Sequence, residues 1–173
     1  GHTTFNSTAT AAISNVDDAA TGTLTTGGTV AEGGTVTSTL TATDADGAIT
    51  GTAYQWQISD NGLTGWTDIA GATSSSYTIA SDQSQVGKYL QVTAITTDAL
   101  GGHTAFTSAT TAVIANVDDA ATGSLTTGGT VAEGGTVTST LTATDADGAI
   151  TGTAYQWQIS DNGLTGWTDI AGA

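Results

Sequence analysis

Residues 53–62 read Ala-Tyr-Gln-Trp-Gln-Ile-Ser-Asp-Asn-Gly, and they alternate apolar with polar side chains before a turn signal. Tyr54, Trp56 and Ile58 follow the two-residue period of a strand that buries one face. The Asn61-Gly62 pair is a favoured hairpin sequence, because both residues tolerate a positive φ. We therefore predict a half-buried strand that ends in a hairpin turn.

Similar short segments, rich in Thr and Val, lie on both sides of this stretch, and no helical period competes with them. The strands expected in one unit cover 22–26, 35–43, 53–59, 66–69, 75–80, 87–96 and 104–114. Trp56 falls where an immunoglobulin sandwich carries its core tryptophan, and Gly87 and Tyr89 fall where it carries its tyrosine corner. The sequence thus predicts an all-β fold of immunoglobulin-like β-sandwich type.

The chain also repeats itself. Residues 1–72 align without gaps to residues 102–173 at an offset of 101, with seven mismatches. This period is the size of one small sandwich domain and is too long for a solenoid unit. We expect 1–15 to be the last strand of a preceding repeat, 16–116 a complete repeat, and 117–173 the truncated first part of the next.

Composition restricts the partners. The 173 residues include sixteen acidic residues and one basic residue, Lys88, for a formal charge of −15. Binding to nucleic acid or to an anionic membrane surface needs basic residues, so neither partner is expected, nor is membrane insertion of this segment. The absence of Cys excludes disulfides and thiolate sites, which leaves bound metal as one of the few alternative means of stabilising a small secreted domain.

Acidic residues cluster in the expected turns. Antiparallel topology gathers these turns at the two ends of a sandwich, and in a tandem chain one end faces the next repeat. Ca²⁺ takes six to eight oxygen ligands, and crowded carboxylates repel one another unless a cation is bound. The candidate metal ligands are Asn15, Asp17, Asp18, Asp44, Asp46 and Asp98 at the first end, Glu32 and Asp82 at the second, and Asn116, Asp118, Asp119, Asp145 and Asp147 in the linker and the next repeat. The alternative is that these acids are solvated turn residues that keep the chain soluble.

One family shares a set of short motifs with this chain. The motifs are Tyr54-Gln55-Trp56-Gln57, Trp66-Thr67-Asp68-Ile69, Gly71-Ala72-Thr73, Tyr77-Thr78 and Val86-Gly87-Lys88-Tyr89-Leu90. With them the repeat resembles the extender repeats of giant bacterial surface adhesins, which include biofilm and ice-binding adhesins exported by type I secretion. The resemblance covers the whole repeat. It implies calcium-stiffened immunoglobulin-like spacers that hold a distant adhesive tip away from the cell.

Other chemistry has little support in the sequence. His2 and His103 occupy the same position in successive copies, and no nucleophile–base–acid arrangement can be assembled around them. Trp66 and Tyr77 fit a core better than a sugar-stacking platform. We therefore expect no enzyme.

The expected function is that of an extracellular spacer on a bacterial cell surface or in a matrix filament. Its partners would be neighbouring repeats of the same chain and like chains in a filament. The alternative is an adhesive module, in which the repeats themselves bind glycan or a like chain on another cell.

Overall fold

The computed structural model describes residues 1–173, and they divide into two compact units, Gly1–Val117 and Asp118–Ala173. Every regular element is a β-strand, so the predicted all-β class is confirmed. No helix in the chain has the length and apolar character that crossing a membrane requires.

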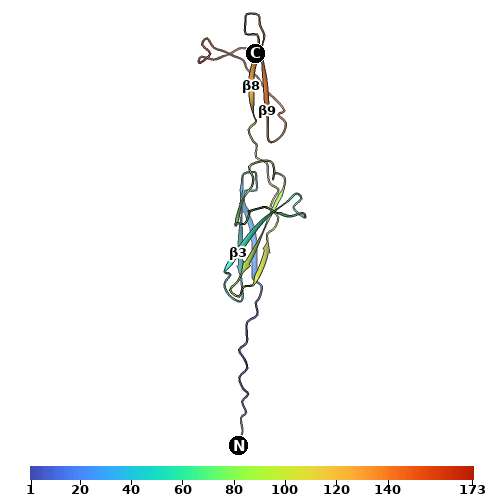
Figure 1. Cartoon of the computed structure of the whole chain (residues 1–173), viewed down its shortest axis with the longest axis vertical. Helices are drawn as coiled ribbons and strands as arrows, with labels where there is room; N and C mark the ends of the chain where they lie inside the picture. Colours follow the sequence, from blue (N-terminus) through green and yellow to red (C-terminus); the bar gives the residue numbers. More distant parts are fainter. The chain divides into compact units, whose positions relative to one another are not determined.

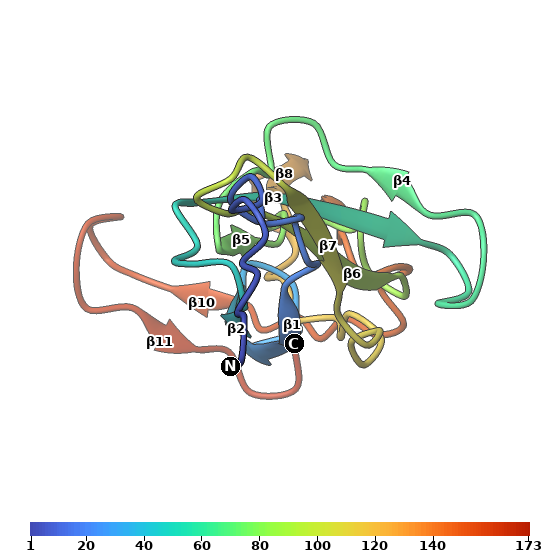
Figure 2. The same cartoon turned by 90° about the horizontal axis from the view of Figure 1, so that it is seen from below.

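The first unit contains two antiparallel sheets (Figure 1). One sheet has the order β1-β2-β5 and the other has the order β4-β3-β6-β7, in which β3, β6 and β7 lie side by side (Figure 2). The strands are β1 (Thr21–Gly28), β2 (Thr35–Thr43), β3 (Gly51–Ser59), β4 (Thr67–Asp68), β5 (Ser76–Thr78), β6 (Tyr89–Thr97) and β7 (His103–Thr107).

The observed strands follow the expected ones closely, with one clear exception. The sequence predicts a last strand over 104–114, but β7 ends at Thr107. Beyond it, the hydroxyl oxygens of Ser108 and Thr111 accept the backbone N–H groups of Val92 and Leu90, both at 3.0 Å. These side chains replace the backbone carbonyls of a regular ladder, so the segment stays beside β6 without forming a strand.

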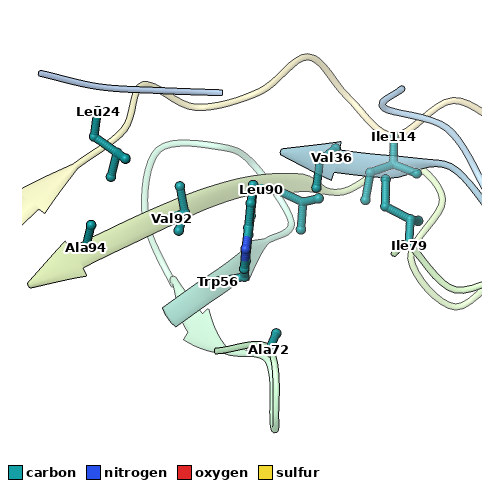
Figure 3. Close-up of a cluster of buried hydrophobic side chains, with 9 residues drawn as sticks. All are labelled: Leu24, Val36, Trp56, Ala72, Ile79, Leu90, Val92, Ala94 and Ile114. Atoms are coloured by element: carbon teal, nitrogen blue, oxygen red, sulfur yellow. The ribbon is translucent and has the colours of Figure 1, made fainter. Parts of the chain in front are cut away.

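A single hydrophobic core lies between the two sheets of the first unit. Leu24 and Val36 come from one sheet, and Trp56, Leu90 and Val92 come from the other (Figure 3). The Trp56 side chain is fully buried, and its Nε1–H donates to the carbonyl of Ser74 at 3.0 Å. Two antiparallel sheets with a shared core are consistent with a β-sandwich.

The second unit contains β8 (Thr122–Gly129), β9 (Val137–Thr144), β10 (Gln158–Ile159) and β11 (Thr168–Asp169). The β8–β9 pair, labelled in Figure 1, repeats the register of β1 and β2 at every position. Likewise, β10 and β11 pair as the ends of β3 and β4 do. Both hairpins are therefore specified by sequence within the hairpin itself.

Residues 1–15 form no strand and are exposed along their length. Their counterparts in the first unit include β7, which is held by pairing with β6. The interpretation of 1–15 as the last strand of a preceding repeat stays a prediction.

Candidate metal-binding site

The turn after β2 in the first unit gathers several of the predicted ligands. The backbone N–H of Asp46 donates to Oδ1 of Asp44 at 2.8 Å, which closes a turn typical of aspartate. The carboxylate of Asp46 then accepts hydrogen bonds from the side-chain amide of Asn15 and from the backbone N–H of Asp18. Asn15, Asp18, Asp44 and Asp46 thus belong to one hydrogen-bonded group.

Two further predicted ligands meet beside this group. Asp98 follows β6 and is buried, and its Oδ1 accepts the N–H groups of Leu100 at 2.7 Å and Gly102 at 3.0 Å. A Cβ atom placed on Gly102 would lie 2.2 Å from Oδ2 of Asp17 and 2.5 Å from Oδ2 of Asp98. The two carboxyl groups therefore converge beside Gly102, where a Cβ atom would have to displace them.

The electrostatics of this end reflect the crowding of carboxylates. Desolvation raises the pKa of Asp17, and the negative charges of Asp98, Asp46 and Asp44 raise it further. Desolvation also acts to raise the pKa of Asp98, but hydrogen bonds from the backbone of Gly102 and Leu100 outweigh it, so that pKa is lowered. Oδ2 of Asp44 is buried and has no hydrogen-bond partner. A bound cation would reduce the repulsion among these carboxylates and would give the unpaired oxygen of Asp44 a partner.

The same turn recurs in the second unit. The N–H of Asp119 donates to Oδ2 of Asp147 at 2.5 Å, and the N–H of Asp147 donates to Oδ1 of Asp145 at 2.9 Å. These bonds reproduce those among Asp18, Asp46 and Asp44, while Asp118 is exposed. Because the arrangement forms in both units, it is a property of the local sequence.

Glu32 dominates the opposite end of the first unit. It follows β1, its N–H donates to the carbonyl of Ala115 at 2.9 Å, and its side chain is only 8% exposed. Its Oε2 accepts the side-chain amide of Gln83 and the backbone N–H of Val117, both at 3.3 Å. Its Oε1 is buried without a hydrogen-bond partner. A buried carboxylate oxygen without a partner is costly, so it is a candidate for binding a cation.

Asp82 is placed differently from its predicted neighbour Glu32. It is exposed, and its Oδ1 accepts both the hydroxyl and the backbone N–H of Ser84, which lower the pKa of Asp82. Gln83 reaches Glu32 instead, and it also donates to Oδ1 of Asn116 at 2.7 Å. Gln83 is not among the ligands predicted from the sequence, where its only signal is its place beside Asp82 in the same turn.

Each unit therefore contributes carboxylate oxygens of a kind that could bind a metal ion, from Glu32 in the first unit and from Asp119 and Asp147 in the second. The only basic residue gives little competition, because Lys88 pairs with the exposed Asp60 at 3.5 Å. The donors are all oxygens, which hard divalent cations prefer. No family model, no curated protein and no solved structure matches this chain.

Proposed function

We propose that this chain is a segment of an extracellular spacer, built from tandem immunoglobulin-like β-sandwich repeats and stiffened by calcium. It holds another part of a bacterial surface adhesin or matrix filament at a distance, and it performs no catalysis. The load passes along the β-sheets of each repeat. Calcium, bound by acids at the ends of the repeats, limits bending.

The observation that carries the calcium proposal is the acidic turn that forms twice. Asp44 and Asp46 in the first unit and Asp145 and Asp147 in the second have the same hydrogen bonds. No basic side chain joins either turn, and the carboxylates of Asp17 and Asp98 lie beside the first one. Oxygen donors at this density, with several negative charges, are typical of calcium sites.

The immunoglobulin-like part of the proposal rests on strand order. The two sheets, β1-β2-β5 and β4-β3-β6-β7, correspond to the ABE and C′CFG arrangement of that fold, with Trp56 in the position of its core tryptophan. The spacer part rests on the repeat. Strands of nine residues, such as β2 and β3, give each repeat a length of roughly 30 Å, so each added copy extends the reach by a similar step.

Thermal unfolding of the chain, in millimolar calcium and in EDTA, tests this proposal. Calcium at about one hundred times its Kd would stabilise the folded state by about 2.7 kcal/mol, which raises the melting temperature. Magnesium should raise it less, because it keeps its own waters and demands a stricter geometry.

A double variant and a control variant test whether the acidic turns bind the calcium. Replacing Asp46 and Asp147 together by Asn should remove most of the calcium response. Asp161→Asn, an exposed acid outside both turns, should leave the response unchanged. Equal melting temperatures in calcium and EDTA for the unaltered chain would contradict the proposal and favour the reading of these acids as solvated turn residues.

A further inference from the structure

The last residues of the first unit pair with the segment that follows β1. The chain leaves the sheet of β1 and β2 after Gly28, and Ala31 then forms a parallel bridge with Ala115. The N–H of Ala115 donates to the carbonyl of Val30 at 3.2 Å, and its carbonyl accepts the N–H of Glu32 at 2.9 Å. Because Ala115 lies beyond β7, which is the edge strand of the other sheet, this bridge joins the two sheets through backbone bonds.

Side chains add to this pairing. Oε2 of Glu32 accepts the backbone N–H of Val117 at 3.3 Å. The side-chain amide of Gln83 donates to the same oxygen at 3.3 Å and to Oδ1 of Asn116 at 2.7 Å. The exit of the chain from the unit is therefore fastened by both backbone and side-chain bonds. We call these contacts the terminal clamp, and its residues are 30–32, Gln83 and 115–117.

The terminal segment, residues 108–117, is also bonded to the chain at the start of β6. The N–H of Ile114 donates to the carbonyl of Lys88 at 2.8 Å, and the N–H of Gly87 donates to the carbonyl of Ile114 at 3.0 Å. The Ile114 side chain is 1% exposed and lies in the core (Figure 3). The terminal segment therefore cannot slide along its own axis without breaking bonds on both of its sides and exposing this side chain.

The two chain segments that meet in the terminal clamp run in the same direction. Near their starts, the N–H of Ala20 donates to the hydroxyl of Thr104 at 3.0 Å, and at their ends Ala31 meets Ala115. The chain enters the unit ahead of β1 and leaves it after Val117. Tension between these two points pulls β1 toward its start and the terminal segment toward its end. The bonds between them lie across this direction, so they are loaded together rather than one after another.

We propose that the terminal clamp is the element of this repeat that resists tension along the chain. The unit withstands a pull through its own entry and exit because the clamp, the bonds to β6 and the core contact of Ile114 must all fail together. A pull that separates the two sides of the clamp sideways breaks the same bonds in turn and needs much less force. The inference rests on the proposed function, since a spacer in use carries tension along its chain.

Single-molecule stretching of the full chain in EDTA, along two axes, tests this proposal. The first axis joins the two ends of the chain. The second joins the C-terminal end to a handle at Thr29→Cys, an exposed position just ahead of the clamp in a chain without cysteine. At about 3.3–3.6 Å per residue, unfolding of the first unit lengthens the chain by about 300 Å on either axis, which identifies the event. We expect the unfolding force to be several times higher on the first axis than on the second.

A pair of proline variants separates the clamp from general stability. Ala115→Pro removes the N–H that donates to Val30. It should raise the unfolding rate at a fixed force about fivefold on the first axis, with a smaller effect on the second. Ala99→Pro is the matched control, because Ala99 follows Asp98 in a turn that the N–H of Gly101 closes at 3.3 Å, and proline suits that position. The control should leave the unfolding rate unchanged on both axes.

Three results would overturn the clamp proposal: equal forces on the two axes, equal acceleration on both axes by Ala115→Pro, or the same acceleration by Ala99→Pro. If Ala115→Pro does not fold, the comparison of the two axes in the chain that keeps Ala115 still decides. Because EDTA is present throughout, the outcome does not depend on calcium. A chain that ignores calcium in thermal unfolding but shows the difference between the axes would refute the proposed stiffening alone.

Discussion

Replacing Glu32 by Gln should raise stability in EDTA and weaken the stabilisation that calcium gives. The side chain is 8% exposed, and its Oε1 has no hydrogen-bond partner, whereas Oε2 is held by Gln83 and Val117. Glutamine keeps the volume and one carbonyl oxygen for these two donors. It removes a negative charge that nothing within the first unit compensates.

The magnitude follows from the buried negative charge, because glutamine at this position still leaves one polar atom unpaired and removes only the charge. An unsatisfied buried polar group costs about 1–3 kcal/mol, and more when it is charged. In EDTA we expect E32Q to be more stable by at least about 1 kcal/mol, which for a domain of this size raises the melting temperature by about 4–8 °C. In saturating calcium the wild type gains about 2.7 kcal/mol at one hundred times its Kd. A tenfold loss of affinity reduces the gain of the variant by about 1.4 kcal/mol, so its advantage shrinks or reverses.

Differential scanning calorimetry of the wild type and of E32Q, each in EDTA and in calcium, gives the four melting temperatures needed. Glu133→Gln is the matched control, because Glu133 is the equivalent residue of the second unit and is exposed. This variant should have the same melting temperatures as the wild type, both in EDTA and in calcium. A lower melting temperature for E32Q in EDTA, with an undiminished calcium response, would refute the reasoning about the buried charge and its role in binding a cation.

Three further predictions concern the first unit. Trp56→Ala should lower its free energy of unfolding by about 3–5 kcal/mol in urea denaturation, whereas Trp157→Ala, at the half-buried equivalent, should cost far less. Asp17→Asn in EDTA should raise the melting temperature near neutral pH. The pKa of Asp17 is raised in the folded state, so protonation of Asp17 stabilises the folded chain. This stabilisation is complete below pH 3.8 and is lost as the pH rises through the folded-state pKa. The gain in melting temperature from Asn should therefore vanish on acidification below pH 3.8. Gly102→Ala should displace the Asp17 and Asp98 carboxylates and weaken calcium binding in a calorimetric titration, and an unchanged affinity would exclude these carboxylates as ligands.

Alternation and turn chemistry in the sequence predicted most of the strands. The strand 35–43 was predicted to the residue, because Thr alternates with Val36, Ser38, Leu40 and Ala42 between two glycine- or aspartate-rich turns. The shortening of the last strand could not be predicted, since it depends on Ser108 and Thr111 meeting the backbone of Val92 and Leu90 across the sheet.

The candidate site was predictable in part for a similar reason. Asp44 and Asp46 are two residues apart, so their turn is local and visible in the sequence. The convergence of Asp17 with Asp98, and of Gln83 with Glu32, joins residues far apart in the chain. Only the folded chain brings such pairs together. The charge pattern of the sequence indicates at which end of the sandwich these residues lie, but it does not show which residues are in contact. The calcium ligand set, the spacer role and the domain boundaries stay predictions.

The solitary basic residue has a consequence for resistance to proteases. Proteases that cleave after Lys or Arg find one target bond in this chain, between Lys88 and Tyr89. The carbonyl of Lys88 accepts the N–H of Ile114 at 2.8 Å, and Tyr89 begins β6 in the middle of a sheet. A protease must draw an extended stretch of substrate into its cleft, so this bond is reached only when the sheet opens. Digestion by such enzymes would therefore proceed at the pace of unfolding, and a chain of these repeats would persist in an environment rich in them.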